Sequence, residues 1–413
     1  MFSIQNTCTK FSWHKTFAAL KYPNYRLWFI GQIISLIGTW VQITAQSFLL
    51  YELTHSMAYL GYIGLASGFP SIVLMLYGGV LADRFPRRNL LIITQTIMMI
   101  LAFILFALVF FNVVKPWHIL FLATVLGIVN AFDVPSRQAF VFELVDKKEL
   151  GNAIALNSTM FNLAAVVGPS LAGILYSYFG ASWCFIVNGI SFLGIIIILF
   201  RMKIASVVPI AREKTLFKEL AVGISYCCKH ETIRLLIIIL AVISCLGMSY
   251  TTLLPAWAIN VLHGDAATNG YLHSARGVGS LGGALLMASL GDISKRYRLL
   301  YWGIFLFPVF LFFFAVNNYL LMSLLCLAGV GFGLMIIFNT LNTLIQALVD
   351  NKLRGRVLSI YSLAFFGGMP IGAFITGNVA ELIGARTTIL ISAIASLAAA
   401  GIFYIKSKKL RLN

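Results

Sequence analysis

Long apolar stretches separated by short polar ones run through the whole chain. Most are about 20 residues or longer, the length that an α-helix needs to cross roughly 30 Å of hydrocarbon, whereas the strands of a membrane barrel alternate over about ten residues. The pattern therefore predicts an all-α membrane protein with twelve transmembrane helices. The expected helices cover residues 26–50, 58–82, 89–111, 117–135, 152–179, 183–203, 233–261, 269–291, 299–316, 319–349, 355–382 and 387–405.

The longest polar stretch, residues 205–232, divides this pattern in the middle. Within it, Phe217, Leu220 and Ile224 recur at helical spacing among basic residues. This spacing predicts a short amphipathic helix on the membrane surface. We expect it to be a cytoplasmic linker between two six-helix halves, 1–204 and 233–413.

The two halves repeat one another. A Leu-Val-Asp sequence that ends at Asp146 recurs 204 residues later and ends at Asp350, and the same offset pairs Gly168 with Gly372. Duplication of a six-helix unit follows from these matches. Two pseudo-symmetric bundles around a site near the middle of the membrane are the architecture of alternating-access transporters.

The composition supports a membrane protein, and the charge fixes its expected orientation. Hydrophobic residues make up 60% and charged residues 10% of the chain, and the net charge is +17. All lysines and arginines except Lys115, Arg276 and Arg386 fall in the two tails, in the linker or in loops on one side of the predicted bundle. Basic loops resist translocation, so we expect both termini to be cytoplasmic. This placement explains the positive charge without nucleic acid.

An abrupt change from apolar to charged residues ends the second expected helix, in the sequence Gly-Val-Leu-Ala-Asp-Arg-Phe-Pro-Arg-Arg at Gly79–Arg88. A weaker copy lies around Asp292. An acid at a helix end can face the positive N-terminus of another helix, while arginines bind acids on neighbouring helices and lipid phosphates. A simple basic loop would explain the arginines and leave Asp83 unexplained. We therefore expect gating roles for Asp83, Arg84, Arg87, Arg88 and Asp292.

This stretch resembles the signature between helices two and three of the major facilitator superfamily, with Pro86 in place of the usual glycine. Four further segments, Thr39–Gln42, 131–139, 156–158 and 167–173, resemble the branch that contains the enterobactin exporters. The similarity covers nearly the whole chain and implies a twelve-helix proton-driven exporter. By analogy with the superfamily, Asp133 would pair with Arg84 or Arg87 at the cytoplasmic gate, where Arg137 also lies.

The fifth helix carries Gly168-Pro169, which resembles the antiporter motif of the superfamily, although Ala172 stands where a glycine is usual. Small residues and a proline let a helix kink and let a neighbour approach closely. A gating role and packing alone both remain open for this segment. The proton-linked arginine that the superfamily carries in helix four is absent, since Ala123 occupies its expected place. Proton coupling is therefore implied by the resemblance alone.

Arg276 lies about two turns into the eighth expected helix. An unpaired charge inside a bilayer costs at least about 2.5–3.5 kcal/mol, so Arg276 should face a wet cavity or a partner. His273 lies one turn earlier on the same face, and imidazole titrates near physiological pH. Two interpretations remain open: Arg276 binds an anionic substrate group while His273 assists or carries a proton, or Arg276 extends to the outer membrane interface.

Polar residues also follow one face of the first helix and recur in the tenth. Such a stripe points toward a cavity or toward a network of bonds between helices. Large aromatic residues nearby are candidate stacking surfaces, with ordinary packing as the alternative. Together with Arg276 and His273, the candidate substrate contacts are Thr39, Trp40, Gln42, Gln46, Tyr250, Asn339 and Tyr361.

The sequence shows no motif typical of an enzyme or of a cofactor-binding protein. It contains no paired carboxylates on one helix face, no P-loop and no metal-ligand spacing among its six cysteines. The Gly-x-Gly-x-x-Gly run from Gly277 to Gly282 lies inside an apolar helix without a preceding strand, which indicates helix packing. We expect neither an enzyme nor a bound cofactor or metal.

The sequence thus predicts a monomeric exporter of the bacterial inner membrane that contacts lipids, uses protons as coupling ion and carries a siderophore or similar metabolite. A broad-range drug efflux pump is the alternative, and a membrane sensor or scaffold that kept the fold is a further one. Pumps for cationic drugs usually carry an acid within the membrane. Because Glu52, Asp133 and Glu381 all lie near expected helix ends, an anionic or neutral solute is favoured.

Overall fold

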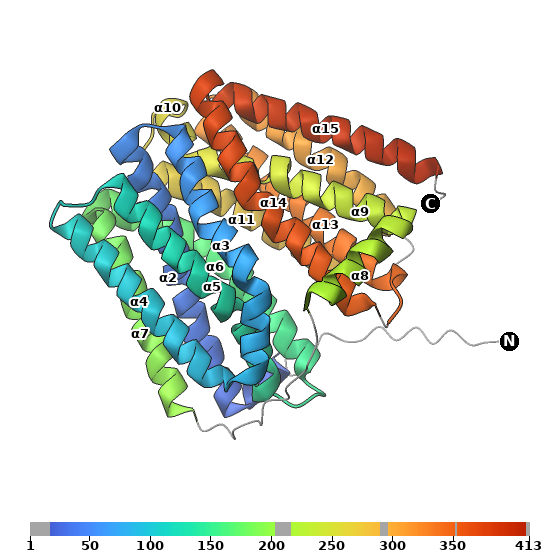
Figure 1. Ribbon diagram of the computed structural model, residues 1–413. Coiled ribbons are helices and arrows are strands. Elements are labelled where there is room, and N and C mark those ends of the chain that lie inside the picture. Colours follow the sequence, from blue (N-terminus) through green and yellow to red (C-terminus); the bar gives the residue numbers. More distant parts are fainter. Residues whose placement is uncertain (1–16, 203–215, 290–295, 352, 410–413) are drawn as a thin grey trace.

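The computed structural model describes residues 17–202, 216–289, 296–351 and 353–409 (Figure 1). Throughout these ranges the chain forms helices and no strand, which confirms the all-α prediction. A short 3₁₀ turn, Ala18–Lys21, opens the first half. Its long helices are α2 (Pro23–Thr54), α3 (Met57–Arg84), α4 (Arg87–Phe110), α5 (Pro116–Leu144), α6 (Leu150–Phe179) and α7 (Ala181–Arg201).

The second half follows an amphipathic helix, α8 (Leu216–Lys229), at the place predicted for the linker helix. Its first span is not the single helix expected from the sequence. It consists of α9 (Glu231–Val242), a π turn (Ile243–Gly247), a 3₁₀ turn (Ser249–Leu253) and α10 (Leu254–Asn260). Pro255, in the first turn of α10, has no N–H to donate, which favours a break just before it.

The remaining helices of this half are α11 (Ala266–Ser289), α12 (Arg296–Val316), α13 (Leu320–Leu348), α14 (Arg354–Ile383) and α15 (Ala385–Lys409). Eleven described segments are long and apolar enough to cross a membrane, and α11 is not among them. α11 carries Asn269, His273 and Arg276 in place of apolar residues, yet it packs between α6 and α13 within the bundle. It therefore completes the twelve expected spans despite its low hydropathy.

The first six long helices and the last six pack in matching ways. α4 lies against α7 as α12 lies against α15, and α3 lies against α5 as α11 lies against α13. The halves meet along two pairs, α3 with α14 and α6 with α11. Figure 1 shows α3 and α14 close together near α10 and spread apart toward their other ends.

The backbones of α3 and α5 come into direct contact at a proline. Pro135 has no N–H for the carbonyl of Ala131, which lies four residues earlier in α5. Gly78 of α3 lies against this oxygen, and a Cβ atom on Gly78 would stand only 1.9 Å from it. In a membrane, helix association depends on such close packing of small residues because lipid supplies no hydrophobic driving force between helices.

The same arrangement joins the two halves at α6 and α11. Pro169 leaves the carbonyl of Ala165 without its helical donor, and a Cβ on Gly277 of α11 would stand 2.7 Å from that oxygen. About two turns earlier on α11, a Cβ on Gly270 would stand 2.4 Å from the carbonyl of Pro169. Gly279 lies equally close to the backbone of α13, at the carbonyl of Ala328. These contacts confirm that the Gly-x-Gly-x-x-Gly run serves helix packing.

We define the basic end of the bundle as the end that carries Arg84, Arg201 and Arg354. Hydrogen bonds join the two halves at the opposite end. Glu381, at the end of α14, accepts hydrogen bonds from the backbone N–H groups of Met57 (2.6 Å) and Ala58 (3.2 Å). A carboxylate in this position satisfies two of the unpaired N–H groups of the first turn of α3 and meets the positive end of its dipole.

Asp265, directly before α11, makes a second link at this end. It accepts hydrogen bonds from the hydroxyl of Ser177 on α6 (2.9 Å) and from the backbone N–H of Thr268 (3.0 Å). Burial opposes its ionisation, but these bonds hold the pKa of Asp265 below its usual value. Closer to the middle of the bundle, Ser170 donates to Ser274 (2.7 Å). This end is therefore closed by charged as well as neutral contacts.

Toward the basic end the two halves diverge (Figure 1). Glycine contacts between α3 and α14 extend from Gly61, against the backbone of α14, to Gly68, against Pro370. Nearer the basic end, a Cβ on Gly79 or on Gly355 would meet no heavy atom of the described residues within 4 Å. The structure is thus closed at one end, and its halves separate toward the other.

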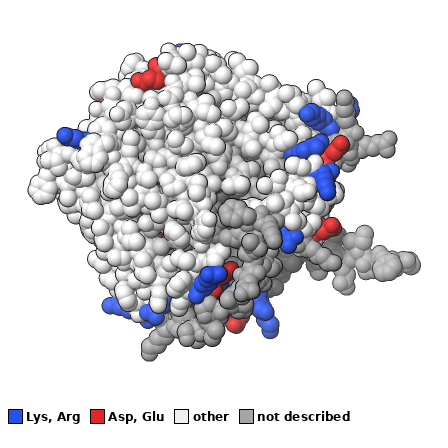
Figure 2. Space-filling model, in the orientation of Figure 1, with Lys and Arg blue, Asp and Glu red and all other residues white. Residues whose placement is uncertain are grey.

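Apolar side chains cover the outside of the bundle. Figure 2 shows charged residues gathered mainly along the lower and right margins, while most of this face is uncharged. Large apolar groups are widely exposed, for example Trp302 at 66% and Leu321 at 70%. Exposure of such surface to water costs about 25 cal/mol per Å², a cost that a surrounding bilayer removes.

Gly78 and its neighbour Gly79 offer a matched test of the α3–α5 contact. Gly78→Ala should lower the free energy of unfolding by about 1–3 kcal/mol, because the new methyl group overlaps the carbonyl of Ala131. Gly79→Ala should leave stability unchanged or raise it by up to about 1 kcal/mol, through helix propensity. Thermal unfolding of the two purified variants checks this, and equal midpoints would contradict the packing described.

Candidate functional site

α11 has two opposite faces. At 100° per residue, Asn269, His273 and Arg276 lie together on one side of the helix. The other side is open to the surroundings: its exposed apolar side chains are Tyr271 (40%), Val278 (54%) and Leu285 (64%). Arg276 therefore lies on the face that turns into the bundle and not on the lipid face. This placement favours a role in binding over an extension of Arg276 along the lipid surface.

The inward face of α11 carries an unusual number of polar atoms without partners. Among the described residues, both ring nitrogens of His273, the Nε of Arg276 and both amide atoms of Asn269 are buried and make no hydrogen bond. Asn269 is completely buried. An unpaired buried polar group costs about 1–3 kcal/mol, so several in one place indicate a site that takes up water or a ligand.

The break in the seventh span brings Tyr250 to the same place. Tyr250 is fully buried on the 3₁₀ turn, its hydroxyl has no partner, and it is close enough to Arg276 for the two to interact electrostatically. Phe314 holds it in position, with ring centroids 6.4 Å apart, and Trp257 stacks on Phe314 at 4.6 Å. Of the predicted substrate contacts, the structure thus brings together Arg276, His273 and Tyr250.

The polar stripe on α2 forms a network between helices. Gln42 accepts a hydrogen bond from Asn188 of α7 (2.7 Å) and donates one to Gln46 (3.4 Å), and both glutamines are buried. Thr39 donates to a carbonyl one turn earlier, and Trp40 packs against α6. In this conformation the amide groups of Gln42 and Gln46 are therefore engaged with protein partners.

The candidates of the tenth and eleventh spans have local contacts. Tyr361 of α14 donates to the carbonyl of Phe338 on α13 (3.1 Å) and its ring is parallel to that of Phe365. Asn339 is half-buried, and its carbonyl accepts a hydrogen bond from Thr343. The bonds described for these residues remain within α13 and α14.

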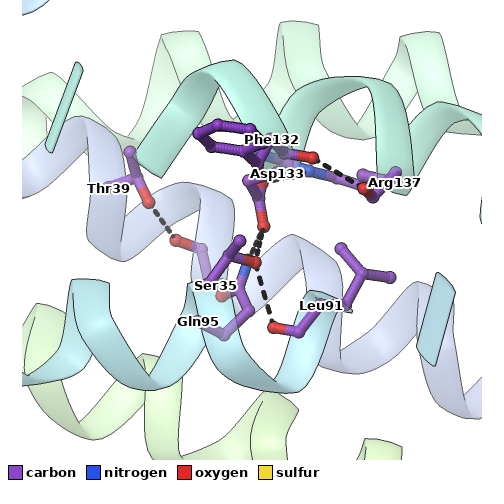
Figure 3. Close-up of polar contacts among 9 residues, drawn as sticks. Ser35, Thr39, Leu91, Gln95, Phe132, Asp133 and Arg137 are labelled. Carbon is purple, nitrogen blue, oxygen red and sulfur yellow. Dashed lines mark hydrogen bonds and ion pairs between the residues drawn. The ribbon is translucent and has the colours of Figure 1, made fainter. Parts of the chain in front are cut away.

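Asp133 is the centre of another polar cluster, in which both oxygens of its carboxylate are paired (Figure 3). Its carboxylate is 0% exposed and accepts hydrogen bonds from Thr94 (2.8 Å) and Gln95 (2.9 Å) of α4. Arg137, one turn later on α5, pairs with its other oxygen. The predicted pairing of Asp133 with Arg84 or Arg87 is therefore wrong for this conformation, because Arg137 occupies that carboxylate.

The prediction that Asp133 lies near a helix end is also wrong. The predicted helix ends at Pro135, whereas α5 is 29 residues long and continues through Pro135 to Leu144. The hydroxyl of Ser136 bonds the carbonyl of Phe132 and supports the helix where proline cannot donate. Asp133 is consequently an acid within a span, although Arg137 balances its charge.

At the basic end, the arginines of the predicted signature bind within the first half. Arg87 pairs with Glu143 at the end of α5 (2.7 Å) and more loosely with Asp83 (3.6 Å). Arg88 donates to two carbonyls at the end of α7. Arg84 is exposed, and Asp292 lies outside the described residues. The signature therefore ties α3, α4, α5 and α7 together.

A family model described as "Transmembrane secretion effector" matches residues 14–411. The chain belongs to this family of major facilitator transporters. It is 25% identical to the staphyloferrin A transporter of Staphylococcus aureus over 94% of this chain and 97% of that one. It is 26% identical to the enterobactin exporter EntS of Citrobacter koseri, with 90% and 89% covered, and 23% identical to macrolide efflux protein A of Streptococcus pyogenes, with 90% and 94% covered.

Solved structures share the fold of this transporter. The nucleoside transporter NupG matches with a TM-score of 0.70 at 13% identity, covering 92% of this chain and 98% of that one. A bacterial homologue of the lysosomal transporter Spinster, in an inward-facing conformation, matches with a TM-score of 0.71 at 14% identity, covering 96% and 98%. These structures show the fold, while the family model and the relatives named above make the chain a membrane transporter and not an enzyme.

Several residues of the transporter's polar clusters were not predicted from the sequence: Thr94, Gln95, Glu143, Asn188 and Asn269. Their signal was available, since each interrupts or borders an apolar run. Asn269 in particular lies four residues before His273 and seven before Arg276, which is one helix face. Among the described residues, no three His, Cys, Asp or Glu side chains gather where they could hold a metal ion.

The Asp133–Arg137 pair can be tested by its charge balance. Asp133→Asn should reduce the free energy of unfolding by about 3 kcal/mol or more, because it leaves the largely buried Arg137 guanidinium without its anion. The double change Asp133→Asn with Arg137→Gln should recover part of this loss, since no charge then remains unpaired. Chemical or thermal unfolding of the three proteins measures the effect, and a double variant no more stable than the single one would contradict it.

Proposed function

We propose that this transporter is a secondary active exporter of a small anionic metabolite, with a siderophore as the leading substrate class. Arg276 carries the proposal, because it is a cation on the inward face of α11 near unpartnered polar groups. In residues 233–413, the acids that the structure describes lie in loops or at helix ends: Asp265, Asp350 and Glu381. An arginine without a nearby acid is suited to bind an anion. Relatives named as staphyloferrin A transporter and enterobactin exporter support this substrate class.

Export proceeds in this proposal by rocking of the halves 1–204 and 233–413 around the site at Arg276. The basic end faces the cytoplasm, with both termini there, since basic loops resist translocation across the bacterial inner membrane. The described structure, closed at the opposite end, then corresponds to the state that loads substrate from the cytoplasm. Arginines of the basic end meet lipid phosphates, and the monomer is the working unit.

Protons are the proposed coupling ion, as in the exporters that the sequence resembles. Asp133 is the carboxylate best suited to carry one, because it is a buried acid within a span. In the described conformation both of its oxygens are engaged, one by Arg137 and the other by Thr94 and Gln95. Proton uptake at Asp133 therefore requires Arg137 to move away during the cycle.

A broad-range drug efflux pump is the second candidate. The similarity to macrolide efflux protein A and the position of Asp133 within a span favour it. Against it, the pairing with Arg137 leaves no unbalanced negative charge in that cluster for a cationic drug. A sensor or scaffold without transport is the third candidate, and transport assays separate it from the other two.

Export of iron chelators tests the proposed substrate class. Cells that lack the gene should secrete less chelator under iron limitation, and Arg276→Ala should not restore secretion. Loss of a hydrogen bond to a charged group costs about 1.5–3 kcal/mol, which is roughly a tenfold or greater loss of substrate affinity. Chelating activity of the medium, at equal amounts of membrane protein, gives the measurement.

The matched control is Arg26→Ala, which removes an exposed arginine at the start of α2 and should export normally. Unchanged secretion in the deletion strain would refute the siderophore class, and a gain in macrolide sensitivity of that strain would support the drug pump. Full export activity of the Arg276→Ala protein would show that Arg276 does not bind the substrate.

The link between Glu381 and α3 should set how readily the closed end opens. Glu381→Gln removes the charge that meets the helix dipole, worth about 0.3–2 kcal/mol, so the closed state should lose roughly twofold or more in population. A cysteine at position 170, in a cysteine-free background, should then react faster with a thiol reagent. Glu52→Gln is the control, because Glu52 bonds Tyr176 within the first half. Equal reaction rates in both variants would contradict the latch.

A further inference from the structure

We propose that α8 is a brace: it holds the basic-end part of α14 within the second half, away from α3, and so keeps the basic end open. The 3₁₀ turn Ala18–Lys21 is its counterpart in the first half, where it holds the start of α6. Such a brace regulates the balance between two conformations of the transporter, and it acts independently of which solute is carried.

α8 binds the starts of two helices at once. Gly223 of α8 lies against α14, where a Cβ atom would stand 2.9 Å from the Cδ1 of Ile360 and 3.2 Å from the carbonyl oxygen of Arg356. Arg234 of α9 donates a hydrogen bond to the carbonyl of Cys228 at the end of α8 (3.1 Å). The missing side chain of a glycine permits such close approach of two helices. α8 therefore connects α9 to α14 at the basic end.

The contact of α8 with these two helices also buries apolar surface. Cys227 of α8, Ile233 of α9 and Val357 of α14 belong to one buried apolar cluster. Separation of α14 from α8 would expose part of this surface, at a cost of about 25 cal/mol per Å². The brace thus stabilises the position that α14 has in the described conformation.

The basic-end part of α14 can bend relative to the rest of the helix. Pro370 interrupts the hydrogen bonds in the middle of α14, and Gly367 and Gly368 lie just before it. The π turn of the seventh span packs against α14 at this level, and the hydroxyl of Ser244 donates to the carbonyl of Phe365. Two neighbouring spans therefore change their helical geometry at the same level, as at a hinge. Between this hinge and the basic end, α8 joins the two spans.

On the basic side of the hinge, α14 has an uncovered face. Ser359, Leu363 and Phe366 precede Pro370 at helical spacing, on the face of α14 that meets Gly68 of α3. All three side chains are exposed in the described conformation. Contact of this face with α3 would cover the two apolar side chains and close the basic end. The brace opposes that movement, because it holds the same segment of α14 on α8.

The first half contains a matching arrangement, at the offset of 204 residues that relates the halves. At this offset Ala19 corresponds to Gly223, and Asn152 corresponds to Arg356. As Gly223 lies against Arg356, Ala19 is completely buried and its backbone N–H donates to the side chain of Asn152 at the start of α6 (2.9 Å). α6 and α14 each pack against the opposite half. Both are thus held at their starts by the element that precedes the first span of their own half.

Disulfide formation across the basic end tests this inference in the full chain, purified in detergent, with the native cysteines replaced by alanine in every protein compared. The reporter pair is Gly79→Cys with Ser359→Cys, because each position lies eleven residues beyond the contact of Gly68 with Pro370. Gly223→Leu displaces α8 from α14 by steric overlap and should raise the rate of disulfide formation roughly fivefold or more.

A second variant, Arg234→Ala, removes the hydrogen bond between α9 and α8 without adding volume, and it should raise the rate about twofold. It provides the test if circular dichroism shows that Gly223→Leu does not fold. The matched control is Gly194→Leu on α7, where a Cβ meets no heavy atom of the described residues within 4 Å, and its rate should equal that of the wild type.

Rates in Arg234→Ala and in folded Gly223→Leu that equal the wild-type rate, or fall below it, would overturn the inference. Disulfide formation is measured without a transported solute. Failure of this test therefore leaves the proposed export function standing, and failure of the export assays leaves the brace standing.

Discussion

Hydrocarbon offers no hydrogen-bond partner, so every polar atom inside this bundle must find one in the protein, in water or in a ligand. Two carbonyls that prolines leave without a helical donor, those of Ala131 and Ala165, meet glycines of a neighbouring helix. Because a glycine has no side chain, the two backbones can approach closely there and gain dispersion contacts along the helices. One such contact lies within the first half, and the other lies between the halves.

The same constraint distinguishes the surroundings of the two arginines inside the membrane, Arg137 and Arg276. Arg137 lies beside Asp133, whose carboxylate accepts four hydrogen bonds, so its charge is balanced and its bonding is complete. Among the described residues Arg276 has no such partner, and the side chains of Asn269 and His273 and the hydroxyl of Tyr250 make no hydrogen bond. A complete cluster stabilises a conformation, whereas an incomplete one costs free energy until something binds. This contrast is why the binding proposal is placed at Arg276.

Contacts between the halves differ in kind at the two ends. At the closed end, Glu381 meets the N-terminus of α3 and Asp265 joins α6 to α11. At the basic end, the arginines of the signature bind acids and carbonyls of their own half. Bonds made to a few charged or terminal groups can be exchanged in one concerted motion, which suits an end that must open and close.

The sequence by itself determined the helical class, the twelve spans and the short amphipathic helix within residues 205–232, because the length and period of apolar runs are local properties. It also singled out Arg276, since a lone charge in a span is visible in the sequence. It did not determine that α5 continues through Pro135 or that the seventh span breaks before Pro255, because neighbouring helices and side chains decide whether a proline interrupts a helix.

Only the tertiary structure decided which groups are paired. It paired Asp133 with Arg137 and joined Gln42 to both Gln46 and Asn188. Among the described residues, it left the Nε of Arg276 and the hydroxyl of Tyr250 without a hydrogen bond. The physical reason is that a hydrogen bond between helices depends on their rotation and approach. Those are set by packing among residues far apart in the chain, at contacts such as Gly78 with Ala131, and spacing along one helix does not reveal them.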